Sequence, residues 1–242
     1  MIKVLSIGNS FSEDAQYYLH DISMHGEEEI YCVNLYIGGC SLEIHCMNIK
    51  ENKKAYRYEV NGKHTDRYRA IEEVLLEEKW DFITFQQASW LSGDEKTYIP
   101  YFDELYRFVK ERSDATLLIH ETWAYEVSES LDAEKREEMY NNISRTYKKI
   151  AKKYGMNIIP VGDVIQTLRS TEEFDYFAGQ PSLNRDGQHL GLDYGRYAAA
   201  LTWYKVLTGK NVKNIGFLPY EFVITENSMK KINKIKEMVE NI

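Results

Sequence analysis

Five short apolar runs, separated by segments with helical periodicity, constrain the fold of this chain more than any other feature of its sequence. The runs cover residues 2–7, 30–37, 80–85, 115–119 and 157–161. Strands that are apolar along their whole length are typical of a parallel sheet covered on both faces. Because parallel strands are joined by crossover helices, this order predicts an α/β fold, a three-layer α/β/α sandwich on a five-stranded parallel sheet.

The segments between the runs carry helix and turn signals. Helices are predicted over residues 15–25, 67–78, 101–112, 133–154, 193–207 and 228–242. Ser12 precedes the first of them as a candidate N-cap, and Gly209 follows the fifth as a candidate stop. Residues 50–66 differ, because an alternating stretch there contains Asn61-Gly62, a strong hairpin signal. We therefore expect one domain over residues 1–242, with a small β-hairpin inserted after the second strand.

Composition argues against several classes of partner. The formal net charge is −8 with acidic and basic residues interspersed, so nucleic acid is not an expected partner. No apolar stretch approaches the ~20 residues that cross a bilayer, so no membrane partner is expected. The three cysteines, Cys32, Cys40 and Cys46, favour buried thiols over a disulfide framework. The first apolar run is too short for a signal-peptide core and predicts an intracellular protein, although a chain whose leader had been removed would give the same pattern.

Polar residues and glycines follow the predicted strands at the points where the strands end. They are Ser10 after the first strand, Gly39 after the second, Gln86 and Gln87 after the third, and His120 and Trp123 after the fourth. The carboxyl ends of the strands form the edge at which open α/β sheets bind ligands. We therefore expect these residues to gather around one site.

The residue types at this edge suit acyl transfer. Ser10 supplies a hydroxyl at a strand-to-helix turn, and Asp186-Gly187-Gln188-His189 places an acid and an imidazole three residues apart. His189 is the candidate base, and Asp186 would orient it. The oxyanion of a tetrahedral intermediate needs donors aimed at it, which the backbone N–H groups of Ser10 and Gly39 and one glutamine amide can provide.

The same segments resemble the SGNH (GDSL-like) hydrolases. Gly8-Asn9-Ser10-Phe11 resembles block I of that family, Asn34 through Ser41 resembles block II, and Asp186-Gly187-Gln188-His189 resembles block V. The resemblance implies a flavodoxin-like fold, a Ser10–His189–Asp186 triad, and oxyanion donors at Ser10 and Gly39. It covers most of the chain and includes no cofactor or metal.

Two segments depart from the family pattern. Asn9 stands where block I usually has Asp, and Phe85-Gln86-Gln87-Ala88-Ser89 replaces the Gly-x-Asn-Asp of block III. The latter resembles the Gln-Gly-Glu-Ser block of the carbohydrate-acetylesterase branch, which implies Gln86 as the oxyanion donor, with Gln87 as the alternative. Residues 83–89 and 121–125 also resemble a poorly characterised bacterial family related to the SGNH hydrolases.

Several single residues allow two interpretations. Trp90, His120 and Trp123 are candidate substrate-binding residues, with Tyr125 and Tyr176 near them, but aromatic residues equally close an ordinary core. His120-Glu121 lacks the HExxH spacing of a zinc site, so no metal is expected. Ser12 competes with Ser10 as nucleophile but suits a helix cap better.

These observations support two functions from different classes. The leading hypothesis is a serine esterase that removes a short acyl group, with acetyl as one candidate, from a carbohydrate-like alcohol. The alternative is a non-catalytic carbohydrate-binding module on the same fold, motivated by the altered block III. A nucleotide binder is disfavoured because the first β-α turn has no Gly-rich phosphate loop.

Overall fold

A seven-stranded sheet forms the centre of the molecule in the computed structural model, which describes residues 1–126, 132–220 and 222–242. Five strands run parallel to one another: β1 (Ile2–Gly8), β2 (Ile30–Tyr36), β5 (Phe82–Phe85), β6 (Thr116–His120) and β7 (Asn157–Ile159). Their spatial order, β2-β1-β5-β6-β7, is the flavodoxin-like order. The predicted parallel α/β fold is therefore confirmed.

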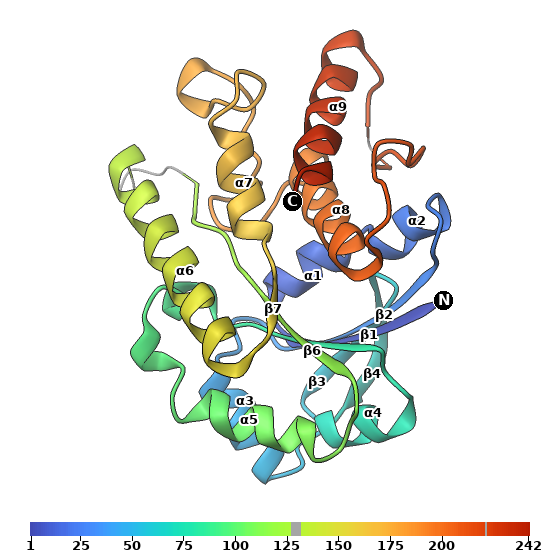
Figure 1. Ribbon diagram of the computed structural model, residues 1–242, viewed down its shortest axis with the longest axis vertical. Coiled ribbons are helices and arrows are strands. Elements are labelled where there is room, and N and C mark those ends of the chain that lie inside the picture. The colour runs from blue at the N-terminus through green and yellow to red at the C-terminus, as the bar shows by residue number, and fades with distance from the viewer. Residues whose placement is uncertain (127–131, 221) are drawn as a thin grey trace.

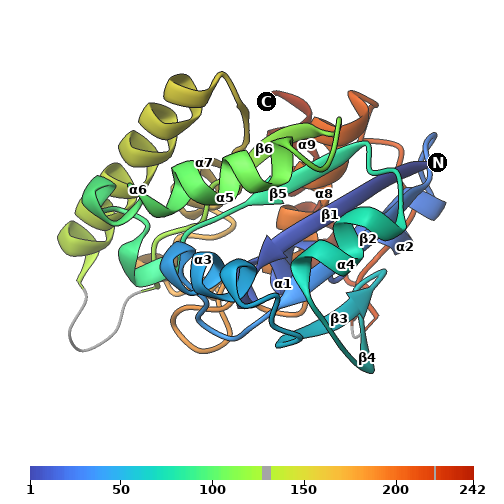
Figure 2. The same ribbon diagram turned by 90° about the horizontal axis from the view of Figure 1, so that it is seen from below.

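Helices cover both faces of the sheet (Figures 1 and 2). One face carries α1 (Ser10–Gln16), α2 (Leu19–Met24), α7 (Val161–Arg169), α8 (Tyr194–Thr208) and α9 (Glu226–Glu240). The other carries α3 (Leu42–Lys50), α4 (Ile71–Glu77), α5 (Tyr101–Lys110) and α6 (Ala133–Tyr154). Two separate hydrophobic clusters, one on each face, make the sandwich three layers thick.

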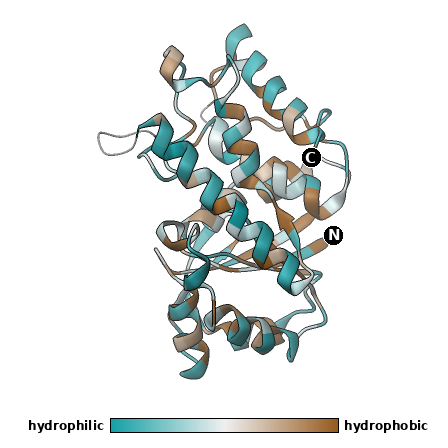
Figure 3. Cartoon of the chain, turned by 60° about the vertical axis from the view of Figure 1, so that its left-hand side comes forward, coloured by the Kyte–Doolittle hydropathy of each residue, from teal (hydrophilic) through white to brown (hydrophobic). Residues whose placement is uncertain are grey.

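Hydropathy follows these layers. Hydrophobic residues concentrate in the central strands and hydrophilic ones along α6, the long helix at the front of Figure 3. Val4 and Leu5, neighbours on β1, are both fully buried and belong to opposite clusters. Alternate side chains of a strand point to opposite faces, so continuous apolar character is what a sheet covered on both sides requires. Among the described residues, no helix has the length and apolar character needed to cross a membrane.

The predicted hairpin belongs to the sheet itself. Strands β3 (Tyr56–Val60) and β4 (Lys63–Arg69) extend the sheet beyond β2 as antiparallel strands, so the sheet has seven strands and not the five predicted. Asn61 and Gly62 form the turn with φ values of 51° and 72°, as the hairpin signal predicts. Pairing of β3 with β2 depends on distant residues, which is why the sequence did not reveal it.

The first helical region differs most from its prediction. Residues 15–25 were expected to form one helix after a Ser12 cap, but α1 begins at Ser10 and a break separates it from α2. Asn9 is the N-cap of α1: its side chain accepts from the N–H of Phe11, and Ser12 Oγ accepts from the N–H of Asn9 in return. This capping box places Ser10 at the first position of the helix.

Two of the remaining helices, α3 and α7, lie outside every predicted helical range, and the others agree more closely with prediction. Helix α6 has its predicted limits, and α8 ends at Gly209, whose left-handed backbone (φ 68°) provides the predicted stop. Helix α4 begins at Ile71 rather than at residue 67, because residues 67–69 belong to β4.

Candidate active site

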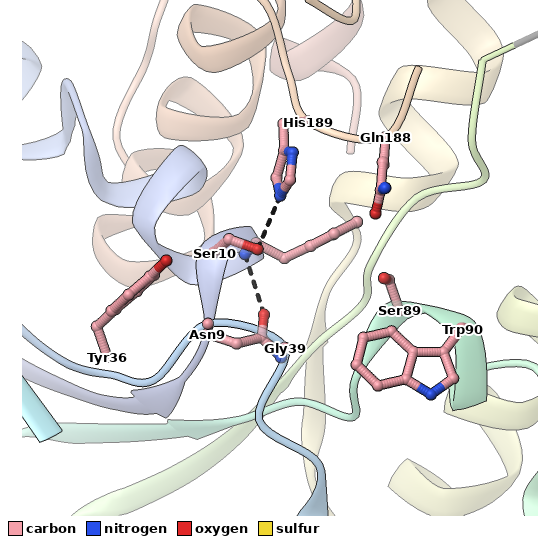
Figure 4. Close-up of a pocket in the computed structure, with 10 residues that line it drawn as sticks. Asn9, Ser10, Tyr36, Gly39, Ser89, Trp90, Gln188 and His189 are labelled. Atoms are coloured by element: carbon pink, nitrogen blue, oxygen red, sulfur yellow. Dashed lines mark hydrogen bonds between the residues drawn. The ribbon is translucent and has the colours of Figure 1, made fainter. Parts of the chain in front are cut away.

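A cavity of about 210 Å³ opens at the carboxyl ends of β1 and β2. Figure 4 shows Ser10 and His189 meeting in it, with Gly39, Tyr36, Ser89, Trp90 and Gln188 around them. Ser10 begins α1 directly after β1, and Gly39 lies in the turn after β2. The strand order therefore places these loops side by side at the edge where the sequence predicted a site.

Ser10, His189 and Asp186 form one continuous hydrogen-bonded chain. Ser10 Oγ lies 2.9 Å from His189 Nε2, and His189 Nδ1 lies 2.8 Å from Asp186 Oδ2. With the Nδ1 proton donated to Asp186, Nε2 is free to accept the proton of the Ser10 hydroxyl. The structure thus brings together the three residues that the sequence analysis grouped from opposite ends of the chain.

Asp186 is oriented by the backbone of its own turn. Its Oδ1 accepts from the N–H groups of Gln188 and His189, at 3.2 and 2.8 Å. Partial burial alone would raise the pKa of Asp186, but these N–H groups and the His189 ring outweigh it and hold the pKa below its ordinary value. The carboxylate therefore remains ionised opposite the imidazole.

Two backbone N–H groups at the cavity are available to an incoming oxygen atom. Across the described residues, the N–H groups of Ser10 and Gly39 have no hydrogen-bond acceptor in the protein. Gly39 has φ 62°, and a Cβ there would lie 2.9 Å from Cη2 of Trp90. Only glycine combines this conformation with this close contact, and Gly39 lines the same cavity as Ser10.

Asn9 connects the loops that form the cavity. Its Oδ1 accepts from the N–H of Phe11 at 3.0 Å and from Nε2 of Gln86 at 2.6 Å, while its Nδ2 donates to the carbonyl of Cys40 at 3.0 Å. The ends of β1, β2 and β5 are thereby joined through one buried side chain. A carboxylate could not donate to Cys40, which gives a physical reason for Asn at this position.

Gln86 lies behind the cavity and is held on both sides. Besides donating to Asn9, its carboxamide accepts at Oε1 from Nδ1 of His120, 2.6 Å away. Burial lowers the pKa of His120 to about 3, so the ring is neutral and its Nδ1 carries the proton it donates. Gln86 does not line the cavity and its amide donates to Asn9, so the prediction of Gln86 as oxyanion donor is corrected to a supporting role behind Asn9.

The Gln87 side chain makes four hydrogen bonds within the protein. Its Nε2 donates to the carbonyl and the hydroxyl of Thr97, and its Oε1 accepts from the N–H groups of Leu42 and Ala88. Both amide hydrogens are thus used away from the cavity. The alternative prediction that Gln87 donates to an oxyanion is wrong for this arrangement.

The three predicted substrate-binding residues separate into two groups. Trp90 lines the cavity and is 59% exposed. His120 and Trp123 are fully buried and do not line it. Trp123 stacks on Phe11 with ring centroids 4.3 Å apart and donates from Nε1 to the carbonyl of Gln188. The expectation of substrate contact at His120 and Trp123 is therefore corrected to a packing role behind the cavity wall.

Comparison with known proteins assigns this chain to a family. A family described as a domain of unknown function, DUF4886, matches residues 3–235. The chain belongs to the DUF4886 family. A crystal structure of a DUF4886 protein from Bacteroides uniformis is 37% identical with a TM-score of 0.87, over 99% of this chain and 93% of that one. No curated protein matches.

More distant solved structures share the fold of this DUF4886 protein. An acetyl xylan esterase matches with 13% identity and a TM-score of 0.59, over 85% of this chain and all of its own length (100%). A protein from Slackia heliotrinireducens classed with the SGNH hydrolases matches with 18% identity and a TM-score of 0.57, over 84% of this chain and 97% of that one. The predicted SGNH-like fold and the link to a poorly characterised related family are both confirmed.

Sequence analysis of the DUF4886 chain missed Asp14, which fastens the His189 loop to the Ser10 helix. Asp14 lies four residues after Ser10 and is fully buried. Its Oδ1 accepts from the guanidinium groups of Arg185 and Arg196, and its Oδ2 accepts from the N–H of Leu190 at 2.7 Å. A charged residue at a buried helical position was the available signal.

One acidic cluster in the DUF4886 protein is paired with an arginine. Glu13, Glu59 and His64 place potential metal-ligand atoms within 4.8 Å of one another. The guanidinium group of Arg57 lies between the two carboxylates, 2.9 Å from Glu13 Oε1 and 2.6 Å from Glu59 Oε1. Arg57 therefore supplies the positive charge that these carboxylates require.

Proposed function

We propose that this DUF4886 protein is a serine esterase with Ser10 as nucleophile, His189 as base and Asp186 as the residue that orients His189. The observation that carries the proposal is the 2.9 Å contact between Ser10 Oγ and His189 Nε2, beside two backbone N–H groups without acceptors. A nucleophile, a base with its own partner, and preorganised donors are the parts that ester hydrolysis needs.

The reaction takes two steps. Ser10 Oγ attacks the ester carbonyl as His189 accepts its proton, and the N–H groups of Ser10 and Gly39 stabilise the oxyanion. The intermediate then expels the alcohol, which takes the proton from His189, and an acyl-Ser10 ester remains. Water attacks that ester with His189 again accepting a proton. The acid leaves and the proton returns to Ser10.

We further propose that the acyl group is short, such as acetyl, and that the alcohol is a carbohydrate. The cavity of about 210 Å³ is small for a ligand site and leaves little room for a long acyl chain. Tyr36 and Trp90 line it, and among the residues that the structure describes no lysine or arginine does. Aromatic walls without cationic groups suit a neutral sugar better than a phosphorylated carrier. The acetyl xylan esterase fold is consistent with this choice.

Turnover of p-nitrophenyl acetate tests the chemistry. Wild-type protein should hydrolyse it faster than the octanoate ester and should react with a fluorophosphonate probe at Ser10. Ser10→Ala should lose both properties, with activity falling at least ~10⁴-fold while circular dichroism is unchanged. Ser12→Ala is the matched control and should still react with the probe. A folded wild-type protein without turnover or labelling would refute the esterase and favour a binding module.

A further inference from the structure

We infer that a second hollow, on the far side of Trp90 from Ser10, binds the sugar chain that carries the ester. The substrate would then be an acylated oligosaccharide rather than an acylated monosaccharide. This inference rests on the proposed esterase function and identifies the alcohol part of the substrate as an oligosaccharide. Residues Ser89 and Trp90 line both spaces, so the second hollow, of about 360 Å³, is the immediate neighbour of the reactive cavity.

Trp90 spans the boundary between the two spaces. It lies in the 3-10 helix Ser89–Leu91, and the end of its indole ring contacts Gly39, whose N–H is the proposed oxyanion donor. Figure 4 shows the ring beside Ser89, across from Ser10. A sugar whose ester reaches Ser10 would therefore have the indole ring next to it.

The turn that carries the exposed ring is held by hydrogen bonds at Ser89. Ser89 Oγ and Tyr125 Oη lie 2.8 Å apart, and Ser92 Oγ, which is fully buried, donates to the carbonyl of Ser89 at 2.7 Å. A large aromatic side chain that is 59% exposed leaves apolar surface in water. An exposed aromatic face on a turn held in this way suits the apolar face of a pyranose ring.

The second hollow has the chemistry of a polyol site. Asp94, Lys135, Glu138 and Asn142 supply both acceptors and donors at its walls, and Met139 supplies an apolar surface. Asn142 accepts at Oδ1 from Arg145, which leaves its amide nitrogen to donate. Mixed donors and acceptors over a small apolar surface suit sugar hydroxyls rather than a fatty acyl chain. Two acidic groups against one lysine disfavour a phosphorylated carrier.

Chain-length dependence tests this inference separately from the esterase chemistry. The probes are chemically acetylated xylose, xylobiose and xylotetraose, with p-nitrophenyl acetate as the small ester. Wild-type kcat/KM should rise at least ~10-fold from the monosaccharide to the tetrasaccharide, because binding to neighbouring rings adds to that of the reacting ring. Trp90→Ala should remove most of this rise, Trp90→Phe should restore part of it, and Asn142→Ala should reduce the tetrasaccharide rate about 3-fold.

Tyr68→Ala is the control, since Tyr68 is another exposed aromatic residue, on β4, that lines neither space. It should keep the full chain-length dependence. Hydrolysis of p-nitrophenyl acetate with equal rates on all three sugars would overturn the second hollow and leave the esterase intact. A dependence that survives in Trp90→Ala would overturn it as well. A preference for p-nitrophenyl octanoate that Asn142→Ala reduces would assign the hollow to the acyl chain instead. Absence of all turnover would end both proposals.

Discussion

The two halves of the candidate site are held by different kinds of interaction. On the Ser10 side, buried neutral amides hold the loops together. Asn9 and Gln86 join three strand ends by hydrogen bonds, and neutral His120 donates to Gln86 behind them. On the His189 side, charged groups hold the loop, through Asp14 with its two arginines and through Asp186. The loops that carry the backbone donors and Ser10 are thus held by hydrogen bonds between neutral side chains. The loop that carries His189 is held by charged side chains, and one of these, Asp186, is half-exposed.

Among the residues that position the reactive groups, the largest expected effect lies at the charged half and concerns rate. On the proposed mechanism, Asp186→Ala leaves the His189 ring without the acceptor that sets its tautomer, so kcat for p-nitrophenyl acetate should fall ~10³-fold. Asp66→Ala, which removes an exposed carboxylate on β4, is the control and should keep the wild-type rate. A loss below 10-fold would mean that the charged half does not position the base.

Removing the buried charge of the same half should affect stability most. Asp14→Ala leaves Arg196 buried without its carboxylate, so the free energy of unfolding should fall by about 3 kcal/mol. Urea unfolding followed by circular dichroism measures it, again against Asp66→Ala. If the variant unfolds at the wild-type urea concentration, Asp14 does not fasten the His189 loop in the way described.

The neutral half is tested by Asn9→Asp. The new oxygen would face the carbonyl of Cys40, where the amide now donates, and should lower the free energy of unfolding by about 2 kcal/mol. Turnover should fall too, because the Ser10 and Gly39 loops separate. Asn52→Asp, at an exposed position, is the matched control. Equal urea midpoints for Asn9→Asp and wild type would show that the donor to Cys40 is dispensable.

The effect that is smallest near neutral pH is a pH dependence of stability, which grows only as the pH falls below 6.5. His120 has a pKa of about 3 when folded against its ordinary value of 6.5, so the unfolded chain binds more protons between these values. Stability is therefore lost as pH falls from 6.5 toward 3, at up to ~1.4 kcal/mol per pH unit. His120→Asn, which can still donate to Gln86, should unfold with a shallower pH dependence. Buried His45, with a pKa also of about 3, remains in both proteins and cancels in the comparison.

Local signals explain which parts of the site could be predicted. Ser10, Gly39, Asp186 and His189 each occupy a turn whose residue types fix its position, so the sequence identified them as a group. The orientation of Gln86 and Gln87 depends on His120 and Thr97, which are distant or lie in an irregular loop. No periodicity reveals which amide atom faces a cavity.

The fold shows the same division between local and distant information. Asn61-Gly62 identified the hairpin, but its pairing with β2 depends on residues more than twenty positions away. Asn9 and Ser12 are both good cap residues, and the sequence favoured the wrong one because a capping box uses both. A charged residue at the buried helical position of Asp14 is explained only by the distant Arg185 and Arg196, which pair with its carboxylate.

The hairpin also decides which strand lies open at this end of the sheet. Without it, β2 would present unpaired backbone groups along an apolar strand, a template for another chain to add on. The outermost strand is instead β4, whose sequence Lys63-His64-Thr65-Asp66-Arg67-Tyr68-Arg69 is almost entirely polar or charged. A charged rim of this kind resists strand-to-strand aggregation, so the same insertion that widens the sheet keeps neighbouring molecules from stacking onto it.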